Sequence, residues 1–184
     1  FSTSKVKRYV LRPFDIRYCY YELTRPLWQE PRPRYFDQLW DGNSFLISRP
    51  AGVADPEGIP LLYTSIVGDH DSIRGHGYYF PVLLQRKNPK PSVSGMASFF
   101  DDDEPTITAN LSPAARAYLK ALGLPDPDAD AATAALVWLH ALAVGYSPAY
   151  LSDNADGIRQ DWPRVPLPAS AAALRASAAL GEQV

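Results

Sequence analysis

The sequence predicts an α+β fold, in which a β-rich N-terminal half is followed by a helical C-terminal half. Short apolar segments separated by Gly, Pro and Asp occupy residues 16–84, as expected for strands and their turns. After residue 111, helix-capping residues precede apolar segments of helical length. Eighteen prolines and 11 tyrosines indicate many turns and an aromatic β portion. A chain in which the strands come first and the helices follow has the order expected of an α+β domain.

Four segments are expected to form strands. Residues 16–21 alternate with a period of two, and residues 44–48 follow an Asp-Gly-Asn turn signal. Residues 60–67 and 78–84 are short apolar runs bounded by loop residues. Because proline cannot donate a ladder hydrogen bond, Pro81 places the last strand at a sheet edge or makes it begin after the proline.

The helices are expected from their caps. Ser112 and Pro113 open a helix that Gly123 ends, and Asp130 caps a nearly all-apolar helix over residues 131–144. An apolar helix of this kind is expected to be buried.

The remaining C-terminal segment contains two more helices. Ser147 and Pro148 open a short helix, and Ser170 caps a last helix that runs to Leu180. Residues 162–168 contain three prolines and are expected to be extended.

These elements predict one compact domain. It comprises a β-rich part over residues 1–98, an acidic linker over residues 99–110 and a helical part over residues 111–184 that packs on the β-rich part. The chain begins at Phe1 without a methionine or a signal segment, so we expect it to be cut from a longer chain.

Composition excludes several protein classes. A chain with 46% hydrophobic and 21% charged residues is globular rather than disordered. The longest apolar run, residues 131–146, is about four residues short of a bilayer span, so no membrane protein is expected. The single cysteine, Cys19, excludes a disulfide within the chain and is typical of the reducing cytoplasm.

The charge is distributed unevenly. Residues 1–100 contain 13 Lys and Arg against 9 Asp and Glu, whereas residues 101–184 contain 5 against 11. Arginine binds phosphates and guanine edges bidentately, so the N-terminal half could form a nucleic-acid surface. The alternative is that these arginines are ordinary solvated or ion-paired side chains, which charge alone favours because strong DNA-binding proteins are usually more basic overall.

The sequence contains few catalytic patterns. It has no glycine-rich dinucleotide or phosphate loop, no methyltransferase motif and no ordered nucleophilic triad, so no self-contained enzyme is expected. Asp69, His70, Asp71 and His76 could supply metal ligands, but their spacing matches neither a helix-face nor a zinc-ribbon pattern. We therefore assign no metal site and expect a polar loop that contacts a ligand or solvent.

Some polar residues are expected to be structural. His140 lies in the apolar helix and is expected to be a buried histidine with one hydrogen bond. Arg12 and Asp15 flank Pro13-Phe14 and are expected to form an ion pair that fixes the turn, with Arg17 as a further structural residue.

Several segments resemble those of bacterial restriction-modification enzymes. Residues 9–18, with Arg12-Pro13-Phe14-Asp15 and then Arg17-Tyr18, resemble the segment where the adenine methyltransferase domain passes into the target-recognition domain. Residues 146–150 and 161–168 resemble a block near the C-terminus of these enzymes, and residues 32–36 and 110–115 resemble two elements between them. The resemblance is best for the single-chain Type ISP enzymes and related N6-adenine methylases.

The resemblance implies a domain that recognises a short sequence in double-stranded DNA and presents one adenine to an upstream methyltransferase domain. The chain itself would then hold no catalytic residue and no cofactor. The parent chain would be an S-adenosylmethionine-dependent adenine-N6 DNA methyltransferase, with ATP and Mg²⁺ where it also carries a helicase or nuclease.

The loops between the strands are the expected base-reading segments. Side chains there that suit base edges are Arg49, Asp69, Asp71, Arg74, His76, Arg86 and Asn88. Side chains that suit phosphates are Lys5, Lys7, Arg8, Arg25, Arg32, Arg34, Lys87 and Lys90.

Two other functions stay open from the sequence. The acidic helical half could dock the methyltransferase to partner domains, in which case the chain is a protein-interaction or assembly module. A self-contained hydrolase that uses Asp69, His70 and His76 is a third hypothesis.

Overall fold

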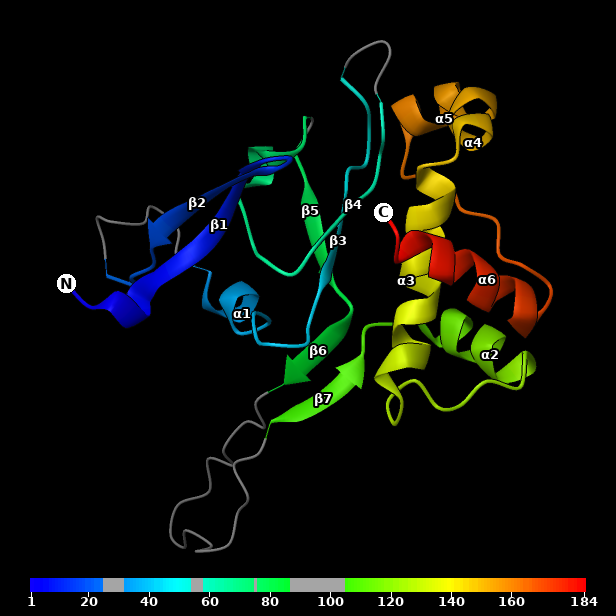
Figure 1. Cartoon of the computed structure of the whole chain (residues 1–184), viewed down its shortest axis with the longest axis horizontal. Coiled ribbons are helices and arrows are strands. Elements are labelled where there is room, and N and C mark those ends of the chain that lie inside the picture. Colours follow the sequence, from blue (N-terminus) through cyan, green and yellow to red (C-terminus); the bar gives the residue numbers. More distant parts are fainter. Residues whose placement is uncertain (25–31, 54–57, 75, 87–104) are drawn as a thin grey trace, which may run out of the picture.

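The computed structural model describes residues 1–24, 32–53, 58–74, 76–86 and 105–184. It confirms an α+β fold with strands in the N-terminal half and helices in the C-terminal half, as Figure 1 shows. The strands are β1 (Val6–Arg12), β2 (Asp15–Tyr20), β3 (Phe45–Ser48), β4 (Leu62–Thr64), β5 (Tyr78–Pro81), β6 (Leu83–Arg86) and β7 (Thr106–Ala109). The helices are α1 (Pro33–Phe36), α2 (Pro113–Ala121), α3 (Ala131–Gly145), α4 (Pro148–Asp153), α5 (Ala155–Gln160) and α6 (Ala171–Gly181), with short 3₁₀ turns η1 (Thr3–Lys5) and η2 (His70–Ser72).

The strands form three small antiparallel sheets in the described part of the chain. β1 and β2 form a hairpin, β4, β3 and β5 form a three-stranded sheet with β3 in the centre, and β6 pairs with β7. Pro81 ends β5, which is an edge strand of the central sheet. The expectation of an edge position for this strand is therefore confirmed.

The sequence does not predict β1 or β7, and the strand expected over residues 78–84 is two strands, β5 and β6, which belong to different sheets. β1 was not expected, because its residues alternate poorly and only Val10 among them is buried. Residues 106–109, which the sequence analysis places in an acidic linker, form β7 and pair with β6. Their Thr-Ile-Thr sequence is β-branched, a local preference that the preceding acidic run obscures. The acidic run itself, residues 101–104, lies outside the described residues.

The helix caps are confirmed. Ser112 Oγ accepts a hydrogen bond from Ala115 N, Asp130 caps α3, and Ser147 and Ser170 cap α4 and α6. Residues 162–168 form neither a helix nor a strand, and the prolines lead us to expect no helix there. No helix in the described part of the chain has both the length and the apolar composition needed to cross a membrane.

Two hydrophobic clusters form the core around α3: the first lies mainly among the helices, and the second joins the helices to the central sheet. In the first, Leu119 of α2, Leu139 of α3 and Leu174 of α6 pack together with almost no exposure. In the second, Leu46 of β3 and Leu61 contact Leu142 of α3. Helix α3 therefore packs against α6 and against the central sheet, and it lies between them in Figure 1.

An ion pair ties β7 to the helical half and makes stability depend on pH. The Asp128 carboxylate accepts two hydrogen bonds from Arg116, at 2.9 and 2.8 Å, and one from Ala109 N at 2.7 Å. The hydrogen bonds from Arg116 come first among the causes that lower the pKa of Asp128 below its usual value.

We expect Asp128→Asn to lose more stability at neutral pH than in acid. Because the pKa of Asp128 is lower in the folded state than in the unfolded state, its contribution is complete above roughly pH 4 and is lost as the pH falls through the folded-state pKa. Urea unfolding at pH 6 and pH 3 should show the wild type and the variant converging at pH 3. A difference that stays constant between the two pH values would contradict this assignment.

Candidate nucleic-acid interface

The loop of residues 69–77 is fixed at its base by hydrogen bonds. Asp69 Oδ1 accepts a hydrogen bond from Asp71 N at 2.8 Å, and Tyr9 of β1 donates to Asp69 Oδ2 at 3.3 Å. The Tyr79 hydroxyl donates to the Asp69 carbonyl at 3.2 Å and lies 2.7 Å from Ser72 Oγ, whose hydroxyl can donate to it. Asp69 is half-buried and acts as the N-cap of η2, so its carboxylate organises the loop.

The β1–β2 hairpin is attached to the same loop. Val10 N donates to Val67 O at 3.2 Å, Asp69 N donates to Val10 O at 3.0 Å, and Arg12 Nη1 donates to Asp71 O at 2.6 Å. The hairpin and the loop therefore form one continuous surface rather than two independent segments.

Three tyrosines line a cavity of about 630 Å³ beside the loop. Tyr9, Tyr35 and Tyr79 meet there, with Asp69 and His76 also on its wall. Burial raises the pKa of Tyr79 to about 12 and raises the pKa values of Tyr9 and Tyr35 further. Their hydroxyls thus stay protonated at neutral pH and remain hydrogen-bond donors.

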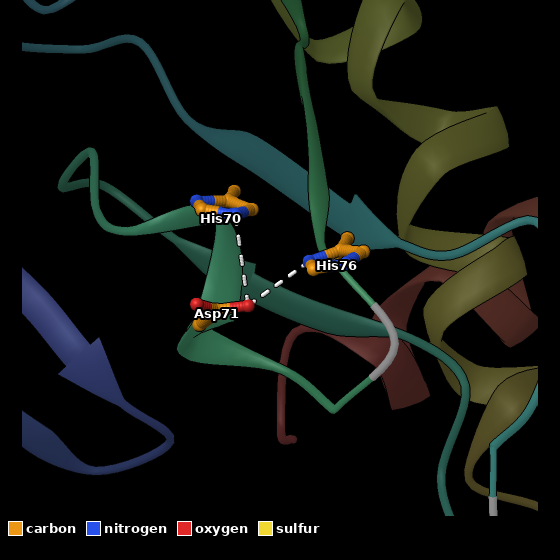
Figure 2. Close-up of side chains that lie close together, drawn as sticks. All are labelled: His70, Asp71 and His76. Carbon is orange, nitrogen blue, oxygen red and sulfur yellow. Dashed lines mark hydrogen bonds and ion pairs between the residues drawn. The ribbon is translucent and has the colours of Figure 1, made fainter.

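The outer end of the loop presents polar side chains to solvent. Asp71, Arg74 and His76 are all exposed, and His76 Nδ1 lies 3.0 Å from Asp71 Oδ1 (Figure 2). The loop thus brings together three of the residues predicted to contact bases. An arginine, a carboxylate and an imidazole on one exposed loop can donate to and accept from base edges.

Arg49 does not belong to this exposed set, which corrects its assignment as a base-reading candidate. Arg49 is the residue that follows β3, and only 3% of it is exposed. Its Nη1 donates a hydrogen bond to the Arg74 carbonyl at 2.9 Å. In this structure Arg49 supports the loop from below and is covered from solvent. The sequence alone predicts that the Arg49 side chain lies at the surface, because arginine is seldom buried.

The other two base-reading candidates lie elsewhere. Arg86 is exposed at the end of β6, which runs from β5 toward the end of the β half away from the loop of residues 69–77 (Figure 1). Asn88 lies outside the described residues.

The described phosphate-contact candidates are spread over the N-terminal segment. Arg8 of β1, Arg32 and Arg34 are exposed, and Lys7 is half-buried on β1. Lys5 forms an ion pair with Glu22, which leaves it less available to phosphate. The remaining candidates, Arg25, Lys87 and Lys90, lie outside the described residues.

The hairpin turn is stabilised differently from the sequence expectation. Asp15 pairs with Arg17, at 2.5 Å from Nε and 3.0 Å from Nη2, rather than with Arg12. Arg12 reaches across to the carbonyl of Asp71. The expected Arg12–Asp15 ion pair was wrong, although the two residues are register partners in the hairpin: Arg17 on the same face of β2 binds the carboxylate, and the Arg12 guanidinium donates to backbone carbonyls. Both arginines nevertheless have contacts that support the local structure.

His140 is a buried structural histidine, as predicted. It is 4% exposed, with Nδ1 at 2.8 Å from Ser177 Oγ and Nε2 at 2.8 Å from the Pro166 carbonyl. It thus has two hydrogen bonds rather than the single one expected, and it connects α3 to α6 and to the extended segment.

Sequence reasoning missed the hairpin tip. Phe14 is 95% exposed and has a φ of 65°. Proline followed by a residue with positive φ is the pattern of a type II turn, and that second position usually carries Gly or Asn. The Pro13-Phe14 dipeptide carried the turn signal, but nothing in the sequence indicated that the phenylalanine would be exposed.

A comparison with known families identifies the class of this chain. The family model of the Type ISP C-terminal specificity domain matches residues 1–184. The chain therefore belongs to the Type ISP C-terminal specificity domain family. No curated protein matches the sequence.

Solved structures share the fold. The chain is similar to part of a cryo-EM structure of a DrdV–DNA complex, with a TM-score of 0.66 and 19% identity over 100% of this chain and 16% of that one. It is also similar to part of the ATP-dependent Type ISP restriction-modification enzyme LlaBIII bound to DNA, with a TM-score of 0.64 and 14% identity over 100% of this chain and 10% of that one. The chain thus spans a small fraction of the length of both proteins.

Proposed function

We propose that this chain is the target-recognition domain of a restriction-modification enzyme and binds double-stranded DNA sequence-specifically. Membership of the specificity-domain family is the observation that carries the proposal. The two structural neighbours are described as DNA complexes, which agrees with it. The exposed loop with Asp71, Arg74 and His76 supplies base-edge chemistry next to the basic hairpin.

The parent enzyme would carry the chemistry. We infer an upstream S-adenosylmethionine-dependent adenine-N6 methyltransferase in the same cytoplasmic chain, with ATP and Mg²⁺ where a helicase or nuclease is also present. This chain would supply recognition and no catalytic group. The hydrogen bonds at the base of the loop support that role, because a base-reading side chain needs a rigid support.

No observation favours the alternative hypothesis, a protein-interaction or assembly module, over DNA recognition. An exposed apolar patch limited to the helical half would favour it, but the described β half exposes large apolar side chains as well. Phe14 and Tyr18 of the hairpin are 95% and 74% exposed, against 59% for Leu180 of α6.

Binding of the isolated chain to mixed-sequence duplex DNA at two salt concentrations tests the proposal. We expect affinity to fall steeply as salt rises, because phosphate contacts release counterions. Absence of binding at low salt would contradict a DNA-binding surface on this chain and would favour the assembly module.

Two substitutions separate base contacts from phosphate contacts. We expect Arg74→Ala to relax selection at one base pair in a randomised duplex library, with a loss of about 1–3 kcal/mol of discrimination. The matched variant Arg8→Ala, on the exposed face of β1, should weaken binding to all DNA sequences alike. It should also reduce the slope of log affinity against log salt concentration by about one. If both variants lower the affinity for preferred and for scrambled DNA equally, the loop does not contact bases specifically.

A further inference from the structure

Two histidines and an aspartate converge on the exposed side of the loop of residues 69–77. The ligand atoms of His70, Asp71 and His76 all lie within 4.8 Å of one another. Asp71 Oδ1 is 3.0 Å from His76 Nδ1 and 3.7 Å from His70 Nε2 (Figure 2). Two ligands at about 2.0–2.1 Å from a tetrahedral zinc ion are about 3.3 Å apart, so both distances are close to those of a metal site.

We propose that His70, Asp71 and His76 bind a divalent transition-metal ion of the zinc class. Imidazole ligands suit Zn²⁺ and its neighbours in the first row, whereas Mg²⁺ and Ca²⁺ prefer oxygen ligands alone. Three protein ligands leave at least one coordination position open to water or another small ligand. The site shares Asp71 and His76 with the base-reading loop proposed above, so zinc binding is measured without DNA and its outcome does not depend on whether the chain binds DNA.

Asp69 occupies the position of an outer-shell carboxylate. His70 Nδ1 lies 3.4 Å from Asp69 Oδ1, while the other ring nitrogen faces Asp71. Metal-binding histidines commonly direct their second nitrogen to a carboxylate, which fixes the tautomer and the ring orientation. Asp69 is itself fixed by Tyr9 and by Asp71 N, so it can orient His70 without becoming a ligand.

The backbone brings the two histidines together before any ion binds. Gly77 N donates to His70 O at 2.5 Å, and the two imidazole rings stack with centroids 4.9 Å apart. A Cβ on Gly77 would come within 2.3 Å of Ile73 Cγ2, which shows how closely the chain packs at this point.

His76 has a backbone conformation that is uncommon for residues other than glycine, although histidine adopts it more often than most residues do. Its φ is 70°, a region that favours glycine, although the sequence places glycine on both sides of it. Strained residues of this kind concentrate at binding and active sites. The positive φ directs the imidazole toward Asp71, and it also offers a matched variant, because glycine fits this conformation.

Zinc titration of the chelator-treated chain tests the proposal. We expect one Zn²⁺ per chain by isothermal titration calorimetry, and at least tenfold weaker binding for His70→Ala, for Asp71→Asn and for His76→Gly. The last variant removes a ligand while the backbone conformation suits glycine, so loss of binding cannot be assigned to misfolding. Asp153→Asn, an exposed aspartate of α4, is the control and should bind zinc as the wild type does.

Histidine NMR provides a second measurement. The chain has three histidines, and both ring nitrogens of His140 are engaged in the interior. Zinc should therefore shift the ring resonances of His70 and His76 and leave those of His140 unchanged. Binding that is unaffected by His70→Ala and His76→Gly, or Mg²⁺ binding as tight as Zn²⁺ binding, would overturn the proposal.

Discussion

Replacing Gly181 by alanine should destabilise the chain by about 1–3 kcal/mol, the usual cost of adding a methyl group to a closely packed interior. A Cβ at Gly181 of α6 would lie 2.1 Å from the Leu139 carbonyl oxygen and 2.8 Å from its carbon. These are backbone atoms of α3 and cannot rotate away, so the two helices would have to separate. The separation would loosen the cluster around Leu174 and Ala178, which are 0% and 2% exposed.

Urea or thermal unfolding measures this effect, and Gly157→Ala is the matched control. Gly157 lies in α5, and a Cβ added there would meet nothing within 4 Å, so alanine should stabilise by about 0.5–1 kcal/mol through helix propensity. For a chain of this length, the loss at Gly181 corresponds to a fall in Tm of about 2–4 °C per kcal/mol. Equal effects of the two variants would contradict the close approach of α3 and α6.

The helical half could be predicted from sequence, apart from the short α5, because its signals are local; α5 has no side-chain cap. Ser112, Asp130, Ser147 and Ser170 each cap the helix that the sequence placed after them. A cap depends on hydrogen bonds within three residues, so no tertiary information is needed to recognise it. The apolar helix over residues 131–144 was expected to be buried, and α3 does contact α6 and the central sheet.

The β half was harder to predict because its strands depend on distant partners. β7 forms through pairing with β6, about 20 residues earlier, and β1 is fixed by its hairpin partner and by the segment near Gly68. Short, half-exposed strands take their stability from such pairs and carry little periodicity of their own. Sequence reasoning therefore found β2 from its alternation and the apolar strands from their composition, and it missed β1 and β7.

The candidate site shows the same limit. The sequence identified the loop of residues 69–77, because Gly, Asp and His gather there, and the structure presents Asp71, Arg74 and His76 at its exposed end. It could not show that Arg49 is buried beneath the loop, since that depends on how the chain after β3 packs against the segment around Arg74. Nor could it show that Arg17 rather than Arg12 pairs with Asp15.

Replacing the buried Arg49 by alanine should cost about 2 kcal/mol or more of unfolding free energy. The substitution removes the side-chain stem from the interior and leaves the Arg74 carbonyl without the hydrogen bond that Arg49 Nη1 donates at 2.9 Å. Arg49→Met should regain the packing but not the hydrogen bond, so it should recover part of the stability. In both variants the amide of Gly77, which bonds to His70 O at the neck of the loop, should exchange faster with solvent deuterium.

Arg74→Ala is the matched control, because Arg74 is an exposed arginine on the same loop. Its substitution should change the unfolding free energy by less than about 0.5 kcal/mol. The two arginines are therefore expected to behave differently. Substitution of Arg49 should lower stability and affect DNA binding only indirectly, through the loop. Substitution of Arg74 should change the selection of DNA sequence and leave the fold unchanged. If Arg49→Ala folds as stably as the wild type and alters selection at a single base pair, Arg49 contacts a base directly and the loop rearranges when DNA binds.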